Sequence, residues 1–125
     1  MAEIILKELS YQINGVLFKA HNALGRFCRE KQYGDAIEGL LKEANIQYIR
    51  EKTLPLPEIE NQFTNRVDFA INDALLIDLK AKPLITKEDY YQMNRYLEAS
   101  GYKLGLIVNF RNKYLKPIRV IRAHS

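Results

Sequence analysis

Residues 66–80 contain two strand-like apolar stretches that also carry acidic side chains. Both stretches are rich in Val, Ile, Leu and Phe, and the Asn and Asp between them are a turn signal, which predicts a β-hairpin. With a loop of residues 72–74, Asp68 and Asp78 lie directly opposite each other, with Cβ atoms roughly 4.5–5.5 Å apart. Lys80 shares their face, because side chains alternate along a strand.

Two carboxylates at that separation repel each other, and in an apolar setting one of them takes up a proton unless a cation binds between them. The hairpin is therefore interpreted as half of a divalent-metal site with Lys80 beside it. A plainer alternative is that Asp68 is a polar residue at a strand edge and that Asp78 pairs with Lys80. The chain has two histidines and one cysteine, Cys28, which disfavours a Cys/His zinc site. Oxygen ligands favour Mg²⁺ or Mn²⁺.

Length and composition predict a single globular domain over residues 1–125. The chain is 47% hydrophobic and 27% charged, as in ordinary soluble proteins. No apolar run approaches the ~20 residues of a membrane span, and the N-terminus lacks the features of a signal peptide. One cysteine excludes an internal disulfide and fits a reducing cytoplasm. We therefore expect a cytoplasmic protein with no membrane partner.

The net charge is +4, and the C-terminal segment is notably basic. From Asn109 onward there is no acid, and the five basic residues are Arg111, Lys113, Lys116, Arg119 and Arg122. Such a segment suits a polyanion such as nucleic acid. It equally suits a solvated edge strand that is protected against aggregation.

Apolar periodicity and turn residues predict the order α-α-β-β-β-α-β-β. Three helices are expected, over about 9–24, over 29–44, and from the capping box at 86–89 to Gly101. Five strands are expected: one over 46–56, the two arms of the hairpin, one over 103–110 and one over 117–121. The nearly continuous apolar run at 103–110 indicates a strand buried on both faces, and the last strand is expected at an edge. The third helix joins two strands as a right-handed parallel crossover, so the fold class is α/β, a mixed sheet flanked by helices.

Two further polar positions lie on helix faces that otherwise pack inward. Glu30 falls on the buried stripe of the second helix, so it either caps the helix start or points into a site. Gln92 and Tyr96, at i and i+4, share one face of the third helix with Asp89. A glutamine in that position is commonly a hydrogen-bonded surface residue.

Taken together in chain order, these acidic, basic and polar residues resemble a known family of proteins. Asp68, then Asp78-Leu79-Lys80, then a helical Gln92-x-x-x-Tyr96 resemble the PD-(D/E)XK nuclease superfamily, and the helical pattern is typical of its RecB-like branch. Glu30-Lys31-Gln32-Tyr33, with the apolar strand at 105–110, resembles more narrowly the small bacterial GxxExxY proteins. The chain departs from that pattern at two positions. The glycine that gives the GxxExxY family its name, three residues before the glutamate, is replaced by Phe27, and Asp78 stands where glutamate is usual.

The resemblance implies a restriction-endonuclease-like αβββαβ core and an Mg²⁺-dependent nuclease acting on nucleic acid, with DNA as the expected substrate. The implied catalytic residues are Glu30, Asp68, Asp78, Lys80 and Gln92, and the implied metal ligands are Glu30, Asp68, Asp78 and the carbonyl of Leu79. Lys80 would act on the attacking water or the transition state, and Gln92 would steady Lys80 or a phosphate. As nucleic-acid contacts we expect Tyr96, Arg111 and Lys113.

Two other functions stay open at this point. A nuclease-fold protein that binds nucleic acid or a protein partner without cutting is the main alternative, since the chain is little longer than the core fold. A purely structural ion-pair network would need more bases than Lys80 to match its acids. A homodimer is conceivable for so small a nuclease. For His21, His124 and Cys28 we expect structural or solvent-facing roles.

Overall fold

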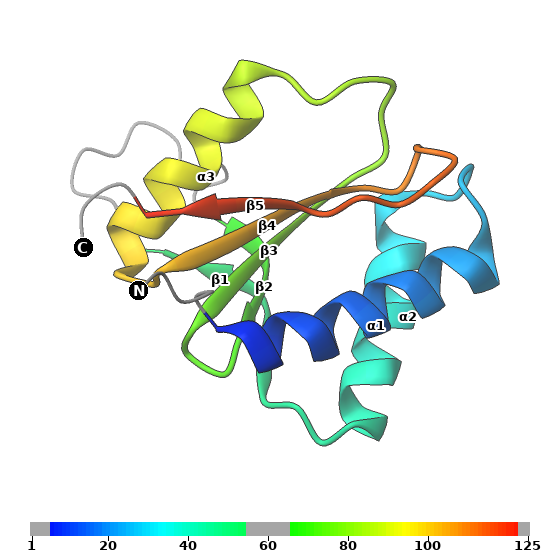
Figure 1. Ribbon diagram of the computed structural model, residues 1–125, viewed down its shortest axis with the longest axis horizontal. Helices are drawn as coiled ribbons and strands as arrows, with labels where there is room; N and C mark the ends of the chain where they lie inside the picture. The colour runs from blue at the N-terminus through cyan, green and yellow to red at the C-terminus, as the bar shows by residue number, and fades with distance from the viewer. Residues whose placement is uncertain (1–5, 55–65, 123–125) are drawn as a thin grey trace.

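The computed structural model describes residues 6–54 and 66–122, and in these the expected element order is confirmed (Figure 1). The helices are α1 (Lys7–Leu24), α2 (Glu30–Glu43) and α3 (Lys87–Ser100). The strands are β1 (Tyr48–Thr53), β2 (Arg66–Ile71), β3 (Leu75–Lys80), β4 (Leu104–Asn109) and β5 (Ile118–Ile121). Among the helices described, none is long and apolar enough to span a membrane.

The five strands form one mixed sheet in the order β1-β2-β3-β4-β5. β3 and β4 are parallel and are joined through α3, whereas the other neighbouring pairs are antiparallel. The parallel crossover and the edge position of β5 are therefore confirmed. In the hairpin, Ile71 pairs with Leu75, so the loop consists of residues 72–74 as expected.

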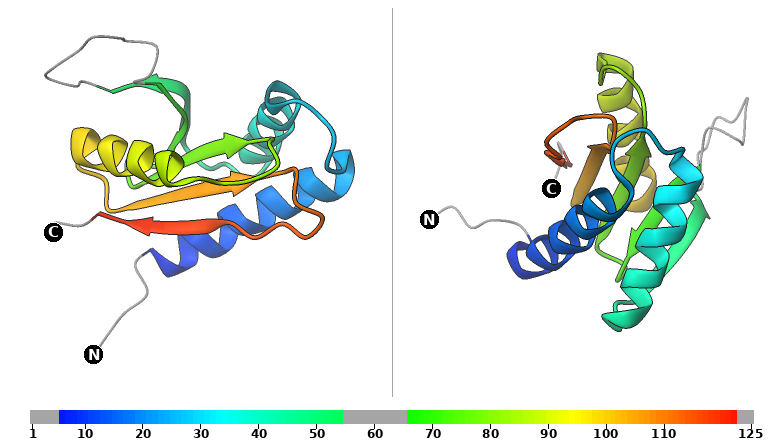
Figure 2. Two further views of the ribbon diagram at one scale, coloured as in Figure 1. Left: turned by 90° about the horizontal axis from the view of Figure 1, so that it is seen from above. Right: turned by 90° about the vertical axis from the view of Figure 1, so that its right-hand side faces the viewer.

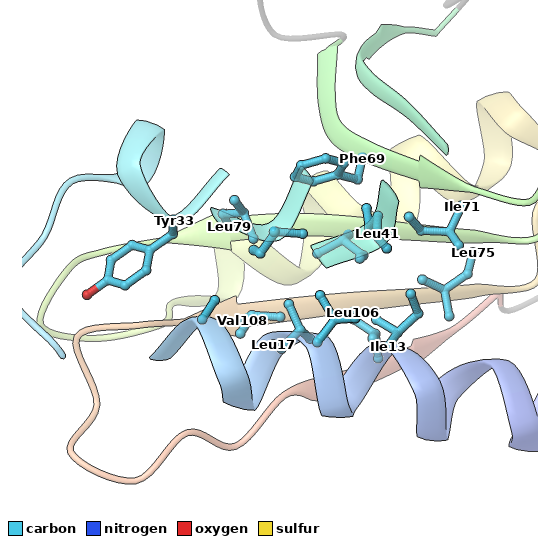
Figure 3. Close-up of a cluster of buried hydrophobic side chains, with 14 of the residues drawn as sticks. Ile13, Leu17, Tyr33, Leu41, Phe69, Ile71, Leu75, Leu79, Leu106 and Val108 are labelled. Atoms are coloured by element: carbon cyan, nitrogen blue, oxygen red, sulfur yellow. The ribbon is translucent and has the colours of Figure 1, made fainter. Parts of the chain in front are cut away.

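Helices cover both faces of the sheet, which gives three layers (Figure 2). α1 and α2 pack on one face through a large apolar cluster that includes Ile13, Leu17 and Leu41 (Figure 3). α3 packs on the other face through a second cluster that includes Met93 and Leu97. All six residues of β4 are buried, which confirms the strand predicted to be covered on both sides.

The boundary between α2 and β1 differs from the expected one for a local reason. α2 ends at Glu43, and β1 begins only at Tyr48, not at residue 46. The chain turns between them: Asn45 has a left-handed backbone with φ 57°, and the Ile46 N–H donates to the Leu41 carbonyl at 3.0 Å. Residues 44–46 therefore close the helix. The last two residues of the expected strand, 55 and 56, lie outside the described residues.

A buried tyrosine fixes the connection between α1 and α2. The Tyr33 hydroxyl donates to the carbonyl of Gly25, which has φ 78°, and accepts a hydrogen bond of 3.3 Å from the Cys28 N–H. The Tyr33 ring stacks on Phe110 with centroids 4.1 Å apart. One side chain thus sets the loop that precedes Glu30.

Tyr33→Phe is expected to lower the free energy of unfolding by about 1–3 kcal/mol, because the Gly25 carbonyl and the Cys28 N–H lose their partner while the ring still fits. Urea unfolding against the wild-type chain measures this difference. Tyr11→Phe is the matched control, since the Tyr11 side chain is 81% exposed, and should change stability little. Equal stability of Tyr33→Phe and wild type would contradict the role of the hydroxyl.

Candidate active site

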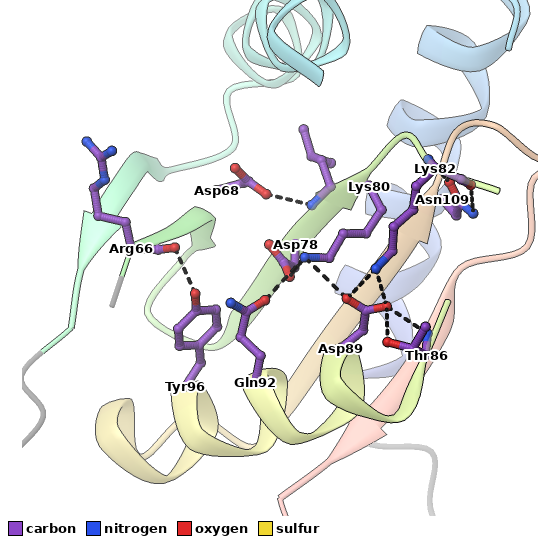
Figure 4. Close-up of polar contacts among 11 residues, drawn as sticks. Arg66, Asp68, Asp78, Lys80, Lys82, Thr86, Asp89, Gln92, Tyr96 and Asn109 are labelled. Atoms are coloured by element: carbon purple, nitrogen blue, oxygen red, sulfur yellow. Dashed lines mark hydrogen bonds and ion pairs between the residues drawn. The ribbon is translucent and has the colours of Figure 1, made fainter. Parts of the chain in front are cut away.

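The site begins where β2 and β3 stop pairing. The last paired residues of the hairpin are Phe69 and Ile77, and beyond them β3 is paired with β4 alone. The Leu79 N–H donates instead to Asp68 Oδ2 at 2.6 Å (Figure 4). The Asp68 carboxylate therefore takes the place of a strand neighbour, and it lies near Asp78 at the end of the hairpin away from its loop.

Asp78 and Lys80 extend from the α3 face of β3 and are paired. Lys80 Nζ lies 3.1 Å from Asp78 Oδ2, 3.2 Å from Gln92 Oε1 and 3.6 Å from Asp89 Oδ1 (Figure 4). Asp78 is 5% exposed, and its Oδ2 accepts no hydrogen bond of good geometry, although the positive charge of Lys80 lies beside it. The structure thus brings Asp68, Asp78 and Lys80 together, as the spacing predicted, and Gln92 beside Lys80, as the resemblance implied, but Asp68 and Asp78 are not a paired position of the two strands.

Asp89 and Lys82 belong to the same polar network and were not among the expected site residues. Asp89 is 5% exposed; its Oδ2 accepts from the Thr86 N–H at 2.7 Å and lies 2.7 Å from Lys82 Nζ. The capping box was visible in the sequence, but the ion pairs depend on how α3 packs on β3. One carboxylate therefore both starts α3 and helps to hold Lys80.

Glu30 reaches the site from the first turn of α2, on the other side of the sheet. It lines a pocket of about 190 Å³ together with Asp68 and Leu79. Partial burial raises the pKa of Glu30; Lys80 lowers that pKa, Asp78 raises it, and the backbone N–H of Ala81 lowers it. Glu30 therefore faces the site and does not act only as a helix cap.

The expected set of three carboxylate ligands is not assembled as the side chains stand. Within residues 6–54 and 66–122, no group of three or more His, Cys, Asp or Glu side chains is arranged to hold a metal ion. The reason is local: the Glu30 carboxylate is engaged with the Ala81 backbone, and Lys80 holds Asp78. Glu30 therefore lies next to the carboxylate pair, and its role as a metal ligand stays a prediction.

The donor set nevertheless suits a small hard cation. Asp68 and Asp78 supply carboxylate oxygens, and the buried Asp78 Oδ2 lies beside the Lys80 ammonium without a hydrogen bond of good geometry. Mg²⁺ is commonly held by one or two carboxylates and keeps several waters, so two are sufficient. The pair therefore fits Mg²⁺ or Mn²⁺ by its chemistry.

Burial and crowding perturb the Asp68 carboxyl group strongly. Burial, the hydrogen bond with Asp78 and the charge of Asp78 raise the pKa of Asp68 to about 8, and the Leu79 N–H offsets only part of this. The two carboxyl groups therefore share a proton near neutral pH when no cation is bound.

Without metal, the contribution of Asp68 to the free energy of unfolding is expected to fall as pH rises from about 4 to about 8. The folded chain binds one more proton than the unfolded chain in this window, because the pKa of Asp68 is about 8 when folded and near 4 when unfolded. Asp68→Asn removes the titrating group but keeps an oxygen for the Leu79 N–H. Between pH 5 and pH 8 in EDTA, urea unfolding should show the stability of this variant rising relative to wild type by at least about 1.4 kcal/mol, the value of one pKa unit. An advantage that did not grow between pH 5 and about pH 8 would contradict this.

The expected nucleic-acid contacts are partly corrected. Tyr96 is 2% exposed and its hydroxyl donates to the Arg66 carbonyl at 3.1 Å, so it is a core residue of α3 and does not face a ligand. Lys113 is exposed. Arg111 is half-buried, and its Nη2 donates to the Ala81 carbonyl at 3.2 Å, directly after Lys80.

The other singled-out residues have structural contacts. His21 is buried, with Nε2 3.0 Å from the Asn112 carbonyl oxygen, and links α1 to the segment after β4. The Cys28 thiol donates to the Leu24 carbonyl at 3.4 Å and packs against the core. His124 lies outside the described residues.

The mixed sheet order, the helices on both faces and the site at the end of the hairpin define a restriction-endonuclease-like α/β fold. A family model described as PD-(D/E)XK nuclease superfamily matches residues 7–121. The chain therefore belongs to the PD-(D/E)XK nuclease superfamily. Its narrower resemblance to the GxxExxY proteins stays a prediction.

Two other comparisons add little detail. No curated protein matches the chain. Among solved structures, the chain is similar to the crystal structure of an alkaline exonuclease (LHK-Exo) from Laribacter hongkongensis, with 14% sequence identity and a TM-score of 0.49. The similarity covers 98% of this chain and 72% of the exonuclease. Because the sequence identity is so low, no site residue of this chain is assigned from that structure.

Proposed function

We propose that this chain is a nuclease that hydrolyses phosphodiester bonds of DNA with Mg²⁺ or Mn²⁺ as its cofactor, in the cytoplasm. The observation that carries the proposal is the carboxylate pair Asp68 and Asp78 next to the ammonium of Lys80. Membership of the PD-(D/E)XK nuclease superfamily supports it.

In this proposal Asp68, Asp78 and the carbonyl of Leu79 bind the cation, and Glu30 adds negative charge at the same pocket. The bound cation neutralises phosphate charge and acidifies water, which hydrolysis of an anionic diester requires. Lys80 donates hydrogen bonds to the attacking water or to the phosphate under attack. Gln92 and Asp89 hold the Lys80 side chain in position from α3.

The experiment is a degradation assay with labelled single- and double-stranded DNA and RNA of one sequence, in Mg²⁺, Mn²⁺ and EDTA. The wild-type chain is expected to degrade DNA only with a divalent cation, and the Asp68→Asn, Asp78→Asn double variant is expected to be inactive under every condition. Cutting that persists in EDTA or in the double variant would contradict the proposed site.

The absence of a third ready ligand among the described residues keeps a second function in view. In it the chain binds nucleic acid without cutting, and Lys80 permanently neutralises Asp78. Salt-dependent binding with no cutting of any substrate in either metal would favour this function. Cutting by the wild-type chain would exclude it.

A further inference from the structure

An exposed aromatic ring lies near two guanidinium groups, next to the candidate active site. The Phe27 side chain, in the α1–α2 connection, is 76% exposed. Arg26 Cζ lies 4.9 Å and Arg111 Cζ 5.8 Å from the centroid of its ring. We refer to Arg26, Phe27 and Arg111 as the Phe27 platform. Most of the Phe27 ring is therefore accessible to solvent and to a ligand.

The platform is fixed in position by contacts between distant parts of the chain. Arg26 Nε donates to the Arg111 carbonyl at 2.7 Å, which joins the α1–α2 connection to the segment after β4. Both segments lie at the same end of the molecule (Figure 1). Arg111 Nη2 donates to the Ala81 carbonyl, next to Lys80, and Glu30 follows Phe27 by three residues. The platform is therefore contiguous with the site.

The two arginines of the Phe27 platform form no ion pair with an acidic side chain of the described residues. In the part of the chain that the structure describes, the ion pairs of 4.0 Å or less do not include Arg26 or Arg111. Arg111 Nε is buried and lacks a hydrogen-bond partner. Two residues after Arg111, Lys113 Nζ lies 5.5 Å from the ring centroid of Tyr114, whose side chain is 79% exposed. Guanidinium groups bind phosphate well through their fixed donors, so this end of the molecule is suited to a nucleic-acid backbone.

We propose that the Phe27 platform binds an unpaired nucleotide: one base stacks on the open part of the Phe27 ring, and Arg26 and Arg111 bind the neighbouring phosphates. Stacking on a side chain needs a free base face, which a single strand or a frayed end offers and the interior of a duplex does not. This inference rests on the proposed function, whose substrate it narrows to nucleic acid with a single-stranded segment at the site.

The test is equilibrium binding of the full chain to three fluorescent probes of equal length, measured by anisotropy in EDTA and again in Ca²⁺. The probes are single-stranded DNA, an abasic strand with the same phosphates, and a blunt duplex. Phe27→Ala should weaken binding of the single strand roughly 5- to 150-fold, the usual range for loss of one stacked base. It should leave binding of the abasic strand and the duplex nearly unchanged.

Three variants control the interpretation. Phe27→Trp should restore binding of the single strand, because it restores a stacking surface. Arg26→Ala should weaken binding of single and abasic strands alike and reduce the slope of log K against log salt by about 1, whereas Phe27→Ala should keep the wild-type slope. Tyr11→Ala removes an equally exposed aromatic ring near the start of α1 and should have no effect.

Equal losses on the single strand and the abasic strand, or no loss on either, would overturn the proposal. So would a wild-type chain that binds none of the probes in either condition, which would leave the platform to a protein partner. These outcomes are separable from failure of the proposed function. If the chain binds single strands through Phe27 but never cuts, the platform is supported and the nuclease function is contradicted. If Phe27→Ala changes neither cutting nor binding, the nuclease function is supported and the platform is contradicted.

Discussion

Lys80→Ala is expected to slow DNA cleavage in Mn²⁺ by about 10²–10⁴-fold, the usual contribution of a group that acts on a proton or charge in the transition state. Binding of the same DNA should fall only slightly, because one charge contributes little to a contact spread over many phosphates. Single-turnover cleavage and anisotropy on the same protein preparation measure both quantities. Retained binding also shows that the variant is folded.

The matched control for this prediction is Lys103→Ala. Lys103 is exposed and directly precedes β4, at the opposite end of the parallel strands from Lys80. Its loss should change neither the rate nor the affinity by more than a small factor. A Lys80→Ala variant that cuts at the wild-type rate would remove Lys80 from the chemistry, whatever the behaviour of the carboxylates.

Mg²⁺ or Mn²⁺ is expected to raise the melting temperature of the wild-type chain, because the ion binds the folded pair Asp68 and Asp78 and not the unfolded chain. At about 100 times Kd this linkage supplies about 2.7 kcal/mol, which for a chain of this size is on the order of 10 °C. Calorimetry or dye-based melting over a metal titration measures the shift.

Asp78→Asn should abolish most of that shift, since it removes one of the two buried carboxylates of the proposed metal site. Glu98→Gln, an exposed acid on α3, is the control and should keep the shift. If the shift survived in the Asp68→Asn, Asp78→Asn double variant, the ion would bind elsewhere on the chain.

The parts of the site that follow from local rules were predictable. The period of two along a strand put Asp78 and Lys80 on one face, and the turn residues set the loop at 72–74, so the acidic pair and its lysine could be found from spacing alone. Chain order and the buried 104–109 strand then gave the parallel crossover.

The parts that depend on how distant elements pack were not predictable. Asp89 was visible as a capping residue, but its ion pair with Lys82 needs the α3–β3 geometry. Tyr96 was expected to contact nucleic acid, yet its side chain is buried in the core and its hydroxyl donates to the Arg66 carbonyl. The contact between Arg26 and Arg111 joins residues 85 positions apart, which no periodicity reports.

The pairing of Lys80 with Asp78 and Asp89 has a consequence for the order of folding and metal binding. Lys80 and Lys82 balance Asp78 and Asp89 within the protein itself, and Asp68 and Asp78 can share a proton. A newly synthesised chain can therefore complete its fold before it meets a cation, and chelation should silence it without denaturing it. Under the proposed function, availability of the ion would then act on a folded protein, as a rapid and reversible control of activity and not as a requirement for folding.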